Sequence, residues 1–121
     1  MKYIILMYAR EDAWSPEEHA LALAESIELC HQLRDMGKFV SAAPLHSPPT
    51  AKCVRLRDGR AVISDGPFAE TKEQLGGYFL IEADDLDDAI AIASKIPGAR
   101  RGTAEIRPLN SSCENLRQPQ R

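Results

Sequence analysis

The hydrophobic pattern opens with a strand and a long amphipathic helix. Residues 2–8 are, after Lys2, continuously apolar or aromatic, as in a strand that is covered on both faces. Ser15-Pro16-Glu17-Glu18 is typical of a capped helix start, and we expect this helix to end at Gly37. Its apolar positions predict one buried stripe: Ala22, Leu23, Ile27, Leu29, Cys30, Leu33 and Met36.

A β-hairpin is the clearest local signal. Two alternating runs, at 53–57 and 60–64, flank Asp58-Gly59, which is typical of a two-residue turn. This turn sets the register and places Val54 opposite Ile63. The face that we expect to meet apolar neighbours carries Val54, Leu56, Ala61 and Ile63.

The rest of the chain is predicted to add three strands and a second helix. We predict strands at 38–43, 76–83 and 103–109 and a helix that Asp85 caps, with Leu86 in its buried stripe. The order of elements predicts the α+β class with a split β-α-β plan, an antiparallel sheet with two helices on one face. The domain is expected to span residues 1–109, and the polar residues 110–121 to form a mobile C-terminal tail.

The predicted sheet has two apolar faces and only enough helix to cover one of them. The runs 2–8 and 76–83 both carry apolar side chains on each face. Large apolar surfaces that stay exposed usually mark an interface. We therefore expect a homodimer in which a second subunit packs sheet against sheet, with two-fold symmetry.

The charge and composition of the chain exclude several classes of protein. The 15 basic and 18 acidic residues give a net charge of -3, which lacks the basic excess of a nucleic-acid-binding protein. No apolar run is long enough for a membrane span, and Arg10 follows the short apolar start at once. We expect a cytoplasmic protein without metal or organic cofactor. Its cysteines, odd in number and widely spaced, are interpreted as idle thiols: Cys30, Cys53 and Cys113.

The loop after the hairpin carries the candidate chemistry. Asp65, Glu70 and Glu73 bring three carboxylates close to Lys72 in a short segment. Crowded like charges spread the pKa values of carboxyl groups, as acid–base catalysis requires, so Asp65 and Glu70 are catalytic candidates. The alternative is structural, with Asp65 bonded to its own turn and Glu70 in an ion pair. His46, in the loop between prolines 44 and 49, is a third candidate as a general base.

Ligand-binding candidates lie on the strands and in the same loop. Arg55 and Arg107 can bind a carboxylate through two nitrogens, or can instead form ion pairs within the chain. Tyr78 can offer its hydroxyl to a ligand or pack as an ordinary aromatic residue. Lys72 and Glu73 complete the candidate binding set.

The segment Ser64–Tyr78, with Asp65-Gly66-Pro67-Phe68 at its start, resembles the signature of the YCII-related, or DGPF-domain, family. The opening Lys2-Tyr3 strand, the Arg55 strand and the closing Glu105–Pro108 strand resemble it too, so the similarity covers nearly all of the chain before the tail. The resemblance implies ferredoxin-like subunits paired as a dimeric α/β barrel. It implies no defined activity: relatives are often encoded beside alternative sigma factors, and the superfamily includes isomerases and monooxygenases.

The chain departs from the shorter relatives at one pair of positions. Those proteins carry a proposed histidine–aspartate pair, and here Asp35 matches the aspartate while Ser26 stands near the histidine position. The pair is incomplete, so a histidine acid–base mechanism is not carried over.

Three functions remain open from the sequence. One is a cofactor-free enzyme of isomerase or lyase type that binds a small anionic or carbonyl metabolite between the 65–72 and 44–49 loops. The second is a non-catalytic ligand-binding or accessory regulatory protein. The third is a structural dimeric interaction module.

Overall fold

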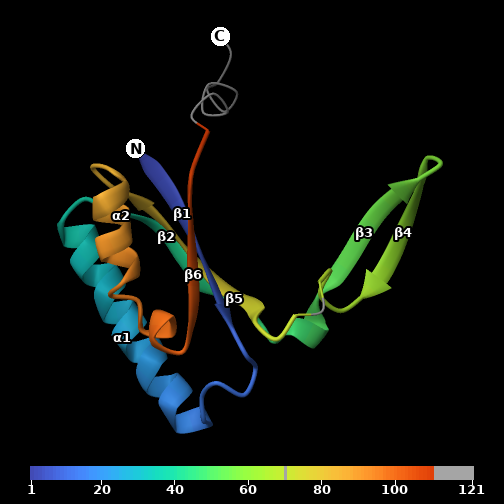
Figure 1. Cartoon of the computed structure of the whole chain (residues 1–121), viewed down its shortest axis with the longest axis horizontal. Helices are drawn as coiled ribbons and strands as arrows, with labels where there is room; N and C mark the ends of the chain where they lie inside the picture. The colour runs from blue at the N-terminus through green and yellow to red at the C-terminus, as the bar shows by residue number, and fades with distance from the viewer. Residues whose placement is uncertain (70, 111–121) are drawn as a thin grey trace.

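Six strands and two α-helices lie along residues 1–69 and 71–110, the part of the chain that the structure, a computed structural model, describes (Figure 1). Two short 3-10 segments, η1 (Pro48–Thr50) and η2 (Pro97–Arg100), join the longer elements. The α-helices and strands are β1 (Lys2–Ala9), α1 (Pro16–Asp35), β2 (Phe39–Pro44), β3 (Lys52–Arg57), β4 (Arg60–Asp65), β5 (Gln74–Glu82), α2 (Leu86–Ala93) and β6 (Gly102–Pro108).

Four of these strands form one antiparallel sheet in the order β2-β5-β1-β6. β5 lies between β1 and β2, which is the split β-α-β arrangement. Both helices cover the same face of this sheet (Figure 1). The α+β, ferredoxin-like fold predicted from the sequence is confirmed.

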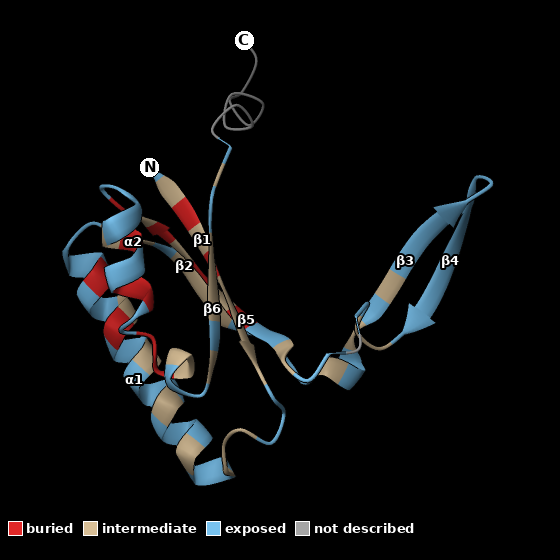
Figure 2. Cartoon of the chain, in the orientation of Figure 1, coloured by how far each residue is buried: buried red, intermediate tan, exposed pale blue. Residues whose placement is uncertain are grey.

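The core lies between this sheet and the two helices. Figure 2 shows the buried positions gathered there, and the helices stand over them. A complete capping box fixes the start of α1, because Ser15 accepts a bond from the Glu18 amide and Glu18 accepts one from the Ser15 amide. The large buried side chains of the core are Tyr3, Ile5, Leu29, Leu33, Phe79, Ile81, Ile92 and Ile96.

The buried stripe of α1 is narrower than predicted. Leu29 and Leu33 are buried, but Leu23, Ile27 and Met36 are 38%, 50% and 52% exposed. Leu23 and Ile27 each directly follow a half-buried residue in the sequence. Because consecutive helical residues point about 100° apart around the helix axis, Leu23 and Ile27 point away from the core. The prediction for these residues was wrong because apolar side chains also occupy protein surfaces. It was wrong for the same reason at Leu86 of α2, which is 51% exposed.

β3 and β4 form a separate two-stranded sheet, the hairpin arm (residues 52–65), inserted between β2 and β5. The predicted register is confirmed, with Val54 opposite Ile63. The expected apolar neighbours are not found within the described chain, because Val54, Leu56 and Ile63 are 63%, 71% and 65% exposed. The arm instead extends away from the body, on the side of the main sheet opposite the helices (Figure 1).

The other face of the main sheet, the open face, has no helix of residues 1–69 and 71–110 over it (Figure 1). Strand alternation places Ile4 and Leu6 of β1 and Leu80 of β5 on this face, since their neighbours Tyr3, Ile5 and the residues flanking Leu80 are buried under the helices. The three side chains are half-buried. The tail predicted at 110–121 falls, apart from its first residue, outside the described residues, as does Glu70.

Candidate functional site

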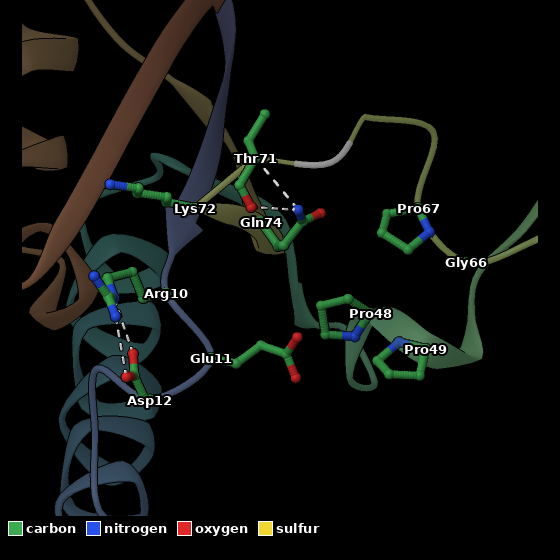
Figure 3. A pocket seen from close by; sticks show the side chains of 10 residues that line it. All are labelled: Arg10, Glu11, Asp12, Pro48, Pro49, Gly66, Pro67, Thr71, Lys72 and Gln74. Atoms are coloured by element: carbon green, nitrogen blue, oxygen red, sulfur yellow. Dashed lines mark hydrogen bonds and ion pairs between the residues drawn. The ribbon is translucent and has the colours of Figure 1, made fainter.

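A pocket of about 570 Å³ lies where the main sheet meets the root of the hairpin arm (Figure 3). This volume is within the range of small-molecule sites. Its lining combines charged and polar side chains with three prolines: Arg10, Glu11, Asp12, Pro48, Pro49, Gly66, Pro67, Thr71, Lys72 and Gln74.

Four chain segments meet at this pocket because strand pairing brings them together. Ala9 at the end of β1 is the partner of Gln74 at the start of β5, so the residues after β1 face those before β5. The prolines of η1 precede the arm, and Gly66 and Pro67 follow it. Gly66 has a φ of 87°, a left-handed conformation that glycine adopts without strain and that turns the chain out of β4. The site therefore joins two strand ends of the body to both roots of the arm.

The charged groups of the pocket differ in how they are engaged. Arg10 donates two hydrogen bonds to the Asp12 carboxylate, of 2.9 and 3.2 Å, and this contact lowers the pKa of Asp12 and raises that of Arg10. Neither Glu11 nor Lys72 has a hydrogen bond or an ion pair to another described residue. In Figure 3 the Glu11 side chain extends toward Pro48 and Pro49. The pocket thus holds one carboxylate and one ammonium that no other described residue engages.

Hydrogen bonds shape the loop that carries Lys72. The Gln74 amide nitrogen donates to the carbonyl oxygens of Thr71 and Ala69, at 2.8 and 3.2 Å, and the Thr71 hydroxyl donates to the Glu73 carbonyl. Gln74 therefore ties the loop to the start of β5 from inside the pocket. These hydrogen bonds hold the backbone of the loop around Lys72 in one conformation.

Among the predicted site residues in the loop and on the arm, Lys72 lines the pocket. Asp65 forms an ion pair with Lys52 at the root of the arm. The Arg55 guanidinium lies over the Phe68 ring, 5.1 Å from its centre, in a cation–π contact. Glu73 accepts a hydrogen bond of 2.8 Å from the Thr103 hydroxyl. Asp65, Arg55 and Glu73 thus have partners within the chain.

The remaining predicted residues are spread over the body. His46 is exposed in the segment between β2 and η1 and does not line the pocket. The hydroxyl groups of Tyr78 and Ser41 are hydrogen-bonded at 2.8 Å. Arg107 donates to Glu105 at 2.9 Å. Glu70, the second catalytic candidate, lies outside the described residues.

A second polar cluster interrupts the open face. Tyr8, Glu105 and Arg107 lie close together there, on β1 and β6. Burial raises the pKa of the Tyr8 phenol, and the neighbouring Glu105 carboxylate raises it further. The protonated phenol, the carboxylate and the arginine form a polar cluster within an otherwise apolar face.

Sequence reasoning missed the five other pocket residues with charged or polar side chains: Arg10, Glu11, Asp12, Thr71 and Gln74. The run Arg10-Glu11-Asp12 is a visible signal, since three charged residues directly follow a buried strand. Their approach to the 71–74 segment depends on the β1–β5 pairing, which local patterns do not reveal. Thr71 and Gln74 lie in the signature segment but carry no charge.

Residues 1–69 and 71–110 contain neither a metal-binding cluster nor a membrane-spanning helix. No three histidine, cysteine, aspartate or glutamate side chains within these ranges come together in a way that could hold a metal ion. Within the same ranges, neither helix is both long and apolar enough to cross a membrane.

The fold is shared with an enzyme of known structure. 5-Chloro-2-hydroxyhydroquinone dehydrochlorinase from Burkholderia phenoliruptrix AC1100, solved in complex with 2,5-dihydroxybenzoquinone, superposes with a TM-score of 0.56. The match covers 91% of this chain and 94% of that one, at 13% sequence identity. At this identity the likeness concerns the fold alone.

Two sequence comparisons give the family. An uncharacterised protein of Rhizobium meliloti (strain 1021) is 36% identical over 114 residues, which cover 90% of this chain and 92% of that protein. The YCII-related domain matches residues 1–111, almost the whole chain. This protein therefore belongs to the YCII-related family.

Proposed function

We propose that this protein binds a small metabolite with a carboxylate or carbonyl group in the pocket at the root of the hairpin arm. The observation that carries the proposal is that Glu11 and Lys72 line one pocket without a partner among the described residues. Two other lysines are paired within the chain, Lys38 with Asp88 at 2.8 Å and Lys52 with Asp65. A cation that lines a cavity and has no partner among the described residues favours an anionic or polar ligand.

The lining residues suggest how such a ligand is held. The Lys72 ammonium donates to a carboxylate or carbonyl oxygen, and Arg10 retains donor groups beyond the two that Asp12 accepts. Pro48 and Pro49 give a rigid apolar wall. The ligand is therefore expected to combine one acidic or carbonyl end with a small apolar body.

Acid–base catalysis at this site is a second candidate, and the position of Glu11 favours it. Its carboxylate extends toward the proline wall opposite the cations and is the group available to exchange a proton with a bound carbonyl compound (Figure 3). In this proposal Asp65 braces the arm. The catalytic roles of Glu70 and His46 stay predictions. The related fold of the dehydrochlorinase, solved with a small quinone, supports a carbonyl ligand of this size.

We further propose that the working form is a cytoplasmic homodimer. The half-buried apolar residues of the open face, Ile4, Leu6 and Leu80, support a second subunit there. Cys30 and Cys53 are both free thiols, as expected in a reducing compartment.

Thermal unfolding with a panel of small acids tests the binding proposal. Pyruvate, 2-oxoglutarate, succinate and inorganic phosphate are suitable probes. A ligand present at about 100 times its Kd stabilises the folded protein by about 2.7 kcal/mol, which is a clear rise in Tm. We expect a rise with at least one carbonyl or carboxylate compound and none with phosphate.

Two variants locate the effect. Lys72→Gln is expected to abolish the rise, and Lys95→Gln, an exposed lysine outside the pocket, is expected to retain it. Glu11→Gln separates binding from catalysis, because it is expected to preserve the thermal shift and remove any turnover. Equal shifts in the Lys72 and Lys95 variants would contradict the proposed site.

A further inference from the structure

The hairpin arm is a small sheet without a core of its own. Among the described strands, β3 and β4 pair only with each other, and all but Cys53 of their residues are exposed. A two-stranded hairpin alone in water is marginally stable at best. Its regular six-pair ladder therefore indicates a surface that is completed by another molecule.

The hairpin arm carries exposed apolar side chains that can contact another molecule. Leu56 and Ile63, with Val54, form one apolar face, and Val62 on the opposite face is 50% exposed. Three large aliphatic side chains on one face of so short a hairpin form an exposed apolar surface of the kind that marks an interface.

The distribution of charge indicates that the arm contacts the body of a second copy and not the arm of that copy. Residues 52–65 carry four basic and two acidic side chains, a formal charge of +2. The rest of the sequence therefore carries -5, since the whole chain carries -3. Two arms in contact would bring two segments of the same net charge together, whereas an arm against a body brings opposite net charges together.

The direction of the arm selects the face. It extends on the side of the main sheet that the helices leave open (Figure 1). A second copy that packs on Ile4, Leu6 and Leu80 comes to lie beside this arm. Two-fold symmetry then places its own arm beside the first body.

We propose that each hairpin arm docks on the body of a second copy of this chain, so that the two subunits exchange arms across the open face. This inference rests on the homodimer of the proposed function. Both roots of the arm also line the pocket, through Pro48, Pro49, Gly66 and Pro67. Docking of the arm thus fixes one wall of the pocket and couples ligand binding to dimerisation.

Sedimentation of a double variant tests the arm directly. Leu56→Thr with Ile63→Thr removes apolar surface but keeps residues that favour strands. We expect the dimer Kd to rise about 100-fold, about tenfold for each side chain. The control is Leu21→Gln on α1, which changes an equally exposed leucine, 67% against 71% for Leu56, and is expected to leave the Kd unchanged.

Hydrogen exchange in the wild type gives a second readout that does not depend on folding of the variant. Amides of residues 53–64 are expected to be protected at concentrations above the Kd and to exchange rapidly below it, because the arm alone is marginal. Residues of the open face are expected to gain protection together with them. A second variant, Arg57→Gln with Arg60→Gln, is expected to raise the Kd and to weaken its dependence on salt.

The outcomes separate the arm from the dimer. A monomeric wild type overturns both the homodimer and the arm exchange. A dimer whose Kd is unchanged in the Leu56 and Ile63 double variant overturns the exchange and leaves the homodimer standing. Protection of the arm without protection of the open face indicates contact between arms and also overturns it.

Discussion

Lys52 and Asp65, the first and last residues of the hairpin arm, face each other across the two strands and form an ion pair at its root. Asp65 begins the Asp-Gly-Pro-Phe run of the family signature and was a catalytic candidate. Its side chain instead faces the arm and does not line the pocket. The signature thus combines a brace of the arm, at Asp65, with pocket residues that follow it.

Replacement of Asp65 by asparagine separates these two interpretations. Both side chains of the pair are largely exposed, and such pairs contribute at most about 1 kcal/mol. We therefore expect Asp65→Asn to lower the free energy of unfolding only slightly and to leave ligand affinity unchanged, as measured by urea unfolding and by titration. The control is Asp58→Asn in the turn of the arm. A tenfold loss of affinity in the Asp65 variant alone would return Asp65 to the ligand site.

Local sequence predicted those features that local physics decides. Asp58-Gly59 fixes the hairpin register because the two-residue turn allows only one pairing, and Ser15 with Glu18 fixes the helix start. Residue type alone did not predict burial: Ile27 is exposed although apolar. A globular chain has more apolar side chains than one core can cover, so the pattern overestimates the buried set.

The site was predicted only in part for a different reason. Lys72 was identified because it lies in the signature segment. Arg10, Glu11 and Asp12 were not, because their place beside that segment is set by the pairing of Ala9 with Gln74, residues far apart in sequence. Long-range pairing is decided by tertiary packing, on which local patterns are silent.

Close contact at Gly102 gives a stability prediction. A Cβ atom at Gly102 would overlap the carbonyl oxygen of Tyr8, whereas one at Gly76 would meet the nearest atom, the carbonyl oxygen of Met7, at 3.9 Å. We expect Gly102→Ala to separate β6 from β1 locally and to cost about 1–3 kcal/mol, a typical overpacking penalty. Gly76→Ala is the matched control and is expected to be nearly neutral in urea unfolding. Equal costs would show that the β1–β6 contact is looser than described.

The capping box gives a second stability prediction. Ser15→Ala removes the side-chain acceptor for the Glu18 amide and is expected to cost about 1 kcal/mol. Ser26→Ala is the control within the same helix, because the Ser26 hydroxyl donates to the Ala22 carbonyl, whose helical hydrogen bond does not depend on it. Thermal unfolding followed by circular dichroism should show a lower Tm for the first variant alone.

Glu18 makes the stability of the fold depend on pH. A hydrogen bond from Arg101, with a second from the Ser15 amide, lowers the pKa of Glu18 from 4.5 to about 2. A carboxyl group whose pKa is lowered on folding stabilises the folded state above its unfolded pKa. This contribution is lost as the pH falls from about 4.5 to about 2.

The measurement is the difference in unfolding free energy between the wild type and Glu18→Gln. We expect the difference to be constant above about pH 5 and to disappear near pH 2. Glu17→Gln changes a carboxylate of the same helical turn that has no recorded bond to an arginine. A Glu18 difference that is as large near pH 2 as at neutral pH would argue against the ion pair with Arg101.

Ligand titration of the isotope-labelled wild type, followed through backbone amide shifts, tests the proposed pocket most directly. With the best probe of the thermal panel, we predict shifts that saturate at Glu11, Asp12, Thr71 and Lys72, on the two segments that β1–β5 pairing brings together. Saturating shifts confined to the open face, at Leu6 and Leu80, would contradict the pocket as the ligand site.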